Sequence, residues 1–222
     1  MRRSFASLFV LVLLAAGCGS PDSSSSTAHS TSTTPVSSSA RIAAGQLSQL
    51  AVKPAAPMTG YSRAQFGPAW ADVDHNRCDT RDDILHRDLT QIVLEPGSTC
   101  VVKQGTLHDP YTGNSISFVR GPNSSVIQID HLVALGDAWR TGATGWSAEL
   151  REQYANDPVV LLAVDGPQNG AKGDADASQW LPPNQFYDCA YVVKQITIKT
   201  KYRLWVTSDE RDAMKNVLSG CS

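Results

Sequence analysis

The chain has 222 residues, of which 41% are hydrophobic, and its formal net charge is −2 at pH 7. This weakly acidic balance excludes nucleic-acid binding through overall charge, so any phosphate-binding surface would have to be local. The sequence contains no internal repeat, which argues against a repeat architecture.

The N-terminus has the pattern of a secretory signal over residues 1–17. Arg2 and Arg3 precede an apolar run over residues 8–16, which is too short to span a membrane comfortably. Leu14–Cys18 resembles a bacterial lipobox, with Ala in place of the usual Leu, in which Cys18 would be lipidated. We therefore expect an exported lipoprotein anchored at the outer face of the cell membrane. Simple secretion and a retained N-terminal anchor are the alternatives.

Residues 18–45 are predicted to be the lipobox Cys and a disordered tether. The stretch Ser20–Ala40 is almost entirely Ser, Thr, Ala and Pro, and it cannot bury enough apolar surface to offset its ordering entropy. Residues 46–222 are predicted to form a single domain. Loss of the signal would leave 17 basic against 21 acidic residues, a net charge of −4.

Hydrophobic periodicity and turn residues predict an α+β domain. In chain order we expect a helix over Asp79–Leu89, strands over Gln91–Leu94 and Thr99–Lys103, a turn at Asp109–Asn114, and strands over Ser115–Arg120 and Val126–Ile129. After these we expect helices over Leu132–Arg140 and Ser147–Tyr154, then a strand over Val159–Val164, and then helices over Gln168–Gln179 and Cys189–Trp205. A capping box, Thr207-x-x-Glu210, predicts a last helix to Leu218.

Four cysteines remain in the predicted domain, and an even number in an exported protein indicates two disulfides. Three pairings are possible, and we favour the local one, Cys78 with Cys100 and Cys189 with Cys221. A zinc site is disfavoured because no Cys-x-x-Cys or Cys-x-x-His spacing occurs.

The residues with the clearest chemistry are Asp130-His131, at the end of a predicted strand, and Asn169-x-x-Lys172 in a later helix. Phosphodiester hydrolysis needs a base for water and a cation for the phosphate. Asp130 and Asn169 offer oxygen ligands for a divalent ion such as Mg²⁺, or Mn²⁺. His131 would act as the base, and Lys172, one turn after Asn169, could contact phosphate. Each feature alone is more often structural, but their order along the chain is more specific.

The segment from Val126 to Pro183 resembles the HNH endonuclease superfamily, whose ββα-metal fold carries an Asp-His on its first strand and an Asn on its helix. More closely, Tyr61–Cys221 is similar to secreted actinobacterial HNH proteins of the GmrSD C-terminal nuclease type. The resemblance implies that Asp130 and Asn169 hold the metal and that His131 is the general base. It rests on the motifs Cys78-Asp79-Thr80-Arg81, Asp109-Pro110-Tyr111-Thr112-Gly113, Ile129–Leu135, Asn156-Asp157-Pro158, Asn169–Asp174 and Trp180–Pro183.

One position departs from the HNH pattern. Val160 stands where an Asn usually braces the hairpin that orients the base, so a neighbour such as Asn156 would have to replace it, or the bracing is weaker. Arg81 could clamp phosphate, or form a structural ion pair with Asp79 or Asp83. A helical basic cluster, Lys194, Lys199, Lys201 and Arg203, could follow a nucleic-acid backbone, although a solvated helix face is favoured.

The sequence therefore predicts a metal-dependent endonuclease that acts on DNA or RNA. The alternative is a non-catalytic surface lipoprotein that keeps the HNH fold as a binding module. The intact Asp130-His131 and Asn169-x-x-Lys172 motifs favour the enzyme, whereas Val160 and the acidic charge favour the binding module. No protein partner is implied.

Overall fold

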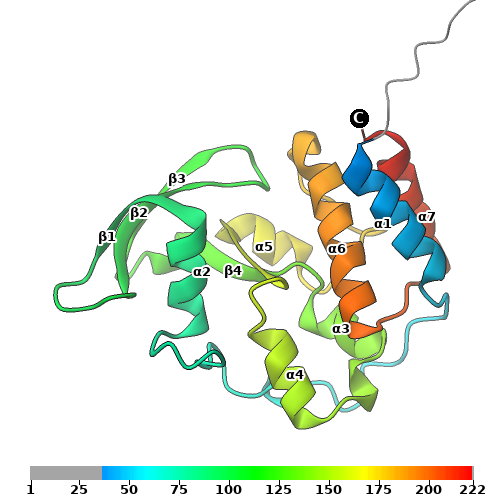
Figure 1. Cartoon of the computed structure of the whole chain (residues 1–222), viewed down its shortest axis with the longest axis horizontal. Helices are drawn as coiled ribbons and strands as arrows, with labels where there is room; N and C mark the ends of the chain where they lie inside the picture. Colours follow the sequence, from blue (N-terminus) through cyan, green and yellow to red (C-terminus); the bar gives the residue numbers. More distant parts are fainter. Residues whose placement is uncertain (1–36, 222) are drawn as a thin grey trace, which may run out of the picture. The chain divides into compact units, whose positions relative to one another are not determined.

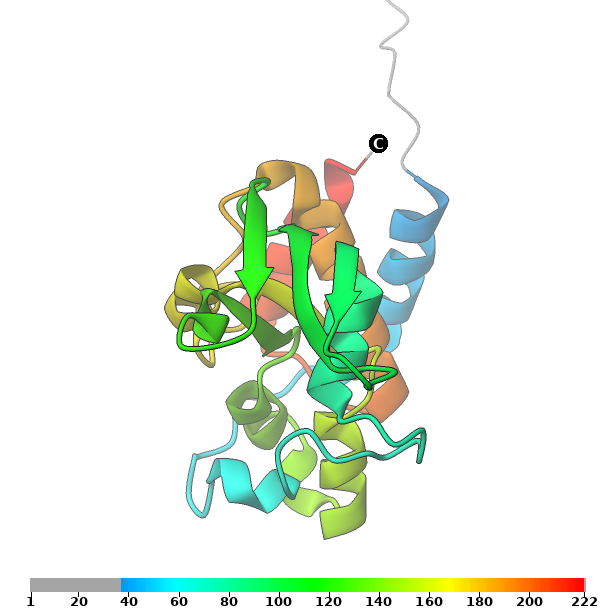
Figure 2. The same ribbon diagram turned by 90° about the vertical axis from the view of Figure 1, so that its left-hand side faces the viewer.

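A three-stranded antiparallel sheet is one component of the computed structural model, which describes residues 37–221 (Figure 1). Helix α2 (Thr80–Asp88) precedes this sheet and places Ile84 and Leu85 in a small apolar core beside it. Figure 2 shows the three strands side by side. In spatial order they are β1 (Leu89–Leu94), β2 (Val102–His108) and β3 (Ser115–Val119).

A second, two-stranded sheet carries the residues of chemical interest. Strands β4 (Ile127–His131) and β5 (Leu161–Asp165) are antiparallel, and α5 (Gly166–Lys172) follows β5 directly. Asp130 pairs with Leu162 and His131 pairs with Leu161. Between the strands the chain passes through α3 (Leu135–Arg140) and α4 (Ala148–Ala155). The strand–strand–helix order agrees with the predicted ββα core, and the predicted α+β class is confirmed.

The main hydrophobic core is formed mainly by helices, which come from both ends and from the middle of the described chain. Helices α1 (Ser38–Gln49), α6 (Asp188–Tyr202) and α7 (Ser208–Ser219) lie together in Figure 1. Their buried apolar side chains join those of α3 and α4 in one cluster. The predicted capping box is confirmed, because the Thr207 side chain accepts from the Glu210 backbone N–H and the Glu210 side chain accepts from the Thr207 N–H.

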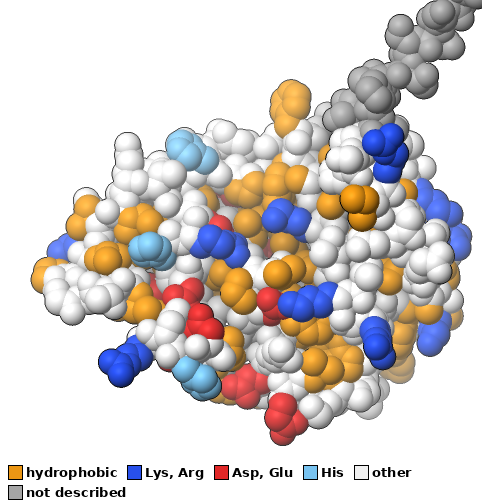
Figure 3. Space-filling model, viewed as in Figure 1, with side chains coloured by type: hydrophobic (Ala, Val, Ile, Leu, Met, Phe, Trp, Pro, Cys, Tyr) orange, Lys and Arg blue, Asp and Glu red, His pale blue; other side chains and the backbone are white. Residues whose placement is uncertain are grey.

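Buried charges connect three of these helices. The Lys199 ammonium lies 2.9 Å from Asp137 on α3 and 2.9 Å from Glu210 on α7, and none of the three side chains is more than 4% exposed. Lys199 is therefore a structural residue and not part of a basic surface. Lys201, from the same predicted cluster, pairs with Asp157 at 2.5 Å. On the face drawn in Figure 3, basic side chains are interspersed with acidic and apolar ones and form no continuous stripe.

Both predicted disulfides are present. One joins Cys78 to Cys100 and the other joins Cys189 to Cys221. The first links the loop before α2 to the loop between β1 and β2. The second links the start of α6 to the end of the described chain after α7. The local pairing favoured from the sequence is thus confirmed.

The N-terminal boundary of the fold differs from the prediction. Residues 38–45, expected to belong to the tether, are the first two turns of α1. The reason is the helical spacing of Ala40, Ala43 and Leu47, which are buried in the main core, together with the side-chain cap from Ser37. Small Ala side chains carry enough apolar surface here because α6 and α7 lie close to the helix.

Helix α5 also differs, since it begins at Gly166 and ends at Lys172, whereas the sequence predicted Gln168–Gln179. The Asp165 side chain accepts a hydrogen bond from the Gln168 N–H and caps the helix early, and Gly173 ends it with a φ of 52°. The predicted signal, the lipobox at Cys18 and the tether up to residue 36 lie outside the described residues. No helix within residues 37–221 is long and apolar enough to cross a membrane.

Candidate active site

His131 ends β4 and is almost fully buried, with 7% of its surface exposed. Its Nε2 lies 2.9 Å from the Ala155 carbonyl oxygen at the end of α4. Because a carbonyl can only accept, Nε2 carries the proton and Nδ1 keeps the lone pair in the neutral ring. Burial lowers the pKa of the imidazole from 6.5 to about 3. The ring is therefore neutral at pH 7, the form that can accept a proton.

Asp130, the preceding residue, is buried between two donors. The Tyr111 hydroxyl donates to Oδ2 at 2.5 Å, and the Lys172 ammonium donates to Oδ1 at 2.8 Å. Lys172 also donates to the His131 carbonyl oxygen at 2.9 Å. Burial and the neighbouring carboxylate raise the pKa of Tyr111, so its hydroxyl keeps the proton that it donates. Each carboxylate oxygen of Asp130 retains one lone pair for a further ligand.

The predicted turn at residues 109–114 places Tyr111 on Asp130. The Asp109 carboxylate accepts from the Thr112 N–H at 2.8 Å through one oxygen and from the Asp165 N–H at 3.0 Å through the other. It therefore fixes both its own turn and the end of β5. The Asp109–Gly113 motif thus acts on the site through the position of the Tyr111 hydroxyl.

Asn169 lies on α5, one turn before Lys172, as predicted from their spacing. Its Nδ2 donates to Gln128 Oε1 on β4 at 2.9 Å. This bond fixes the orientation of the amide and leaves the Asn169 Oδ1 available as an acceptor. Asn169 does not cap the helix, because Asp165 does.

Asp130, His131 and Asn169 line one polar cavity of about 190 Å³. The structure therefore brings together the predicted base and the two predicted metal ligands. Two further charged residues, Arg63 and Asp174, line the same cavity, and neither was predicted as a site residue. Asp174 ends the Asn169–Asp174 motif, so its place in that motif was a signal that could have found it. Arg63 had no signal, because it is far away in the sequence.

Arg63 and Asp174 come to the cavity from segments that are far apart in the sequence. Arg63 begins a short 3-10 helix, η1 (Arg63–Phe66), and makes no ion pair with another residue of the described chain. The Asp174 carboxylate lies so close above Gly136 that a Cβ at that position would collide with it. Glycine at the second position of α3 thus lets the acidic side chain lie at the cavity.

The predicted substrate contacts, Lys172 and Arg81, do not line the polar cavity. The Lys172 side chain is fully buried on Asp130. Arg81 donates to the Ser124 carbonyl at 3.4 Å and to the Ile127 carbonyl at 3.1 Å, so it fixes the start of β4. Both bonds go to backbone carbonyls, and neither is the ion pair with Asp79 or Asp83 that was the alternative prediction for Arg81. The roles of Lys172 and Arg81 in substrate binding stay predictions.

The loop that carries the His131 acceptor is braced without the Asn of the HNH pattern. Val160 is buried, and its carbonyl accepts from the Leu132 N–H at 2.9 Å. Asp157 is the residue that fixes the loop, since it accepts from the Val159 N–H at 3.0 Å and from the Tyr202 hydroxyl at 2.6 Å. Its bonds to Lys201 and Tyr202 connect the loop to α6 and hold the Ala155 carbonyl in place.

An α+β fold with an Asp-His pair on a two-strand unit and an Asn on the following helix defines a nuclease-like protein. Residues 79–217 match the family model described as GmrSD restriction endonucleases, C-terminal domain. The chain belongs to this family. It is also 37% identical over 185 residues to a protein of Arthroderma benhamiae named "Uncharacterized secreted protein", covering 82% of this chain and 86% of the relative. No solved structure gives a significant match.

Proposed function

We propose that the protein is an exported, metal-dependent endonuclease of the HNH type that hydrolyses nucleic-acid phosphodiester bonds. The observation that carries the proposal is the convergence of Asp130, His131 and Asn169 on one polar cavity. Membership in the family of GmrSD restriction endonuclease C-terminal domains supports nuclease chemistry, and the secreted relative supports export.

The residues around the cavity fit a hard divalent cation, Mg²⁺ or Mn²⁺. Asp130 and Asn169 offer oxygen atoms with lone pairs not used by the protein, and Asp174 adds a carboxylate at the same cavity. Oxygen ligands that leave positions for water and phosphate are the preference of such ions. Asp130 and Asn169 would hold the ion, which would neutralise charge on the phosphate during hydrolysis.

His131 is the general base of the proposed reaction. Its Nδ1 accepts the proton of the attacking water, while the Nε2–H bond to the Ala155 carbonyl holds the ring in the required tautomer. Lys172 and Tyr111 hold the Asp130 carboxylate in place. Arg63 is exposed and lines the cavity, and in the proposed reaction it would bind a phosphate oxygen.

The rival function is a binding module that keeps the fold without catalysis. The net acidic charge and Val160 favour it, although Asp157 braces the loop in the region where the Asn of the HNH pattern is missing. The test is cleavage of supercoiled plasmid and of single-stranded DNA and RNA by the purified protein, with Mg²⁺, with Mn²⁺ or with chelator. The enzyme is supported if cleavage requires the metal, and the binding module is supported if the protein retains nucleic acid without cutting it.

Anchoring through a lipid on Cys18 is part of the same proposal. The lipobox-like sequence Leu14–Cys18 supports it. Mass spectrometry of the N-terminal peptide from membrane fractions should identify a diacylglyceryl group on Cys18. An unmodified N-terminus found only in the medium would replace this part of the proposal by simple secretion.

A further inference from the structure

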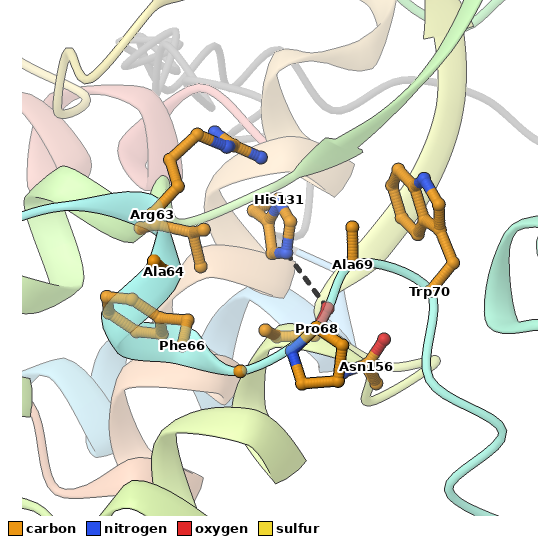
Figure 4. Close-up of a pocket in the computed structure, with 11 residues that line it drawn as sticks. Arg63, Ala64, Phe66, Pro68, Ala69, Trp70, His131 and Asn156 are labelled. Atoms are coloured by element: carbon orange, nitrogen blue, oxygen red, sulfur yellow. Dashed lines mark hydrogen bonds between the residues drawn. The ribbon is translucent and has the colours of Figure 1, made fainter.

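A second cavity adjoins the proposed active site and is lined mostly by apolar side chains (Figure 4). It measures about 210 Å³ and shares Arg63, His131 and Leu135 with the polar cavity. A molecule bound in it would therefore lie next to the proposed general base. Its remaining lining comes from residues 64 and 66–70, with Ala155 and Asn156.

Asn156 lines this cavity and carries a buried acceptor that has no donor. The residue is 1% exposed, and its Nδ2 donates to the Glu152 carbonyl oxygen at 3.0 Å. That bond fixes the amide, because the flipped side chain would bring two oxygens together. The Asn156 Oδ1 has no hydrogen-bond partner among residues 37–221. Because a buried acceptor without a donor costs free energy, a ligand that donates a hydrogen bond there would be favoured.

Trp70 provides a flat aromatic surface at the same cavity. Its backbone has a φ of 60°, a left-handed conformation that is uncommon for a bulky residue. The indole is half-buried, and its plane is 19° from that of the His131 ring, with ring centroids 6.5 Å apart. Aromatic side chains of this kind stack on unpaired nucleobases.

Arg63 adds a cation where the two cavities meet. In Figure 4 its side chain extends above His131. A guanidinium in this place can contact a phosphate oxygen of a strand that crosses both cavities. The two adjoining cavities therefore offer a polar site for a phosphodiester and an apolar site for a planar ring that carries a hydrogen-bond donor.

We propose that the apolar cavity binds one unpaired nucleobase next to the phosphodiester that is cut, and that an exocyclic amino group of this base donates to Asn156 Oδ1. The inference rests on the proposed nuclease function and names its substrate class: single strands, or duplexes that release one base. The volume corresponds to about seven water molecules, which suits one base and not a base pair. Adenine is the simplest occupant, because its exocyclic group is a donor only.

The first experiment measures nucleotide binding without any bond to cut. Deoxyadenosine 5′-monophosphate and its analogue lacking the amino group, purine deoxyriboside 5′-monophosphate, are titrated into the exported protein, and the Trp70 indole N–H signal is followed by NMR. We expect the analogue to bind about tenfold more weakly, because Asn156 Oδ1 stays without a donor. Asn156→Leu should remove this difference. Trp70→Ala lacks the reporter indole, so its binding is measured by calorimetry, and it should bind both nucleotides more weakly than the wild-type protein does. Equal affinities in the wild-type protein, or no shift at Trp70, would overturn the proposal.

The second experiment separates this inference from the proposed function. Cleavage of oligothymidylate that carries one central adenine is compared with cleavage of the same strand in which that base is unsubstituted purine, which lacks the amino group. If cleavage is faster beside the adenine and Asn156→Leu loses this preference, both the base site and the nuclease function are supported. Cleavage with equal rates on the two strands keeps the nuclease and refutes the base site. Selective nucleotide binding without cleavage of any strand keeps the base site and refutes the nuclease.

Discussion

Replacing Lys172 with Met tests whether this residue is part of the fold of the site or a solvated substrate contact. The Lys172 and Asp130 side chains are 0% and 4% exposed, and the ammonium lies 2.8 Å from Oδ1. Lys172→Met keeps most of the volume but leaves Asp130 as a buried carboxylate without its cation. Loss of one partner of a buried pair costs about 3–5 kcal/mol of unfolding free energy. Urea denaturation measures this loss.

Lys103→Met is the matched control. Its side chain is 47% exposed and lies 3.7 Å from Glu95, so the substitution should cost less than about 1 kcal/mol. Addition of Mg²⁺ should restore part of the stability of Lys172→Met, because a cation at Asp130 would replace the lost charge. A loss below about 1 kcal/mol for Lys172→Met would refute the reasoning. It would place Lys172 with the solvated substrate contacts instead.

Four further substitutions test the hydrogen bond to Asp130, the shared metal site and the pH dependence of stability. Tyr111→Phe removes one donor to Asp130 and should cost about 1.5–3 kcal/mol in urea denaturation, whereas no loss would mean that this bond contributes nothing. Calorimetry with Mg²⁺ should give a larger loss of affinity for Asp130→Ala than for Asn169→Ala, because the first removes a charged ligand; unchanged affinity in both would disprove a shared metal site. Burial raises the pKa of Glu210 from 4.5 to about 7, so the stability that this group contributes is present below pH 4.5 and is lost as pH rises through about 7. Glu210→Gln should flatten the pH dependence of the unfolding free energy. If the variant shows the same pH dependence as the wild-type protein, other groups cause it.

The parts of the site that are local in sequence could be predicted. The alternating apolar run before Asp130 predicted the strand, and the i, i+3 spacing of Asn169 and Lys172 placed them on one helix face. The pairing of cysteines close in sequence was also correct. Periodicity and spacing carry this information because each depends on the geometry of a single element.

The parts that depend on tertiary packing could not be predicted. Ala40, Ala43 and Leu47 have helical spacing, but small Ala side chains in a segment rich in Ser do not predict burial, which here comes from α6 and α7. Lys199 has the pattern of a solvated lysine, and only the folded chain brings Asp137 to it. Arg63 reaches the polar cavity from a segment more than sixty residues before His131. Contacts of this kind have no signal within a short window of sequence.

The most direct test of the proposed mechanism is the rate of single-turnover DNA cleavage by His131→Ala with saturating Mg²⁺. Removal of a general base should slow cleavage by at least about 10²-fold, while the affinity for metal and the circular dichroism spectrum stay unchanged. His108→Ala is the control, because that imidazole is exposed and its hydrogen bond is to Ser115 on β3. More metal should not rescue His131→Ala, since its defect lies in proton removal. A folded His131→Ala protein that cleaves at the wild-type rate would contradict the central claim.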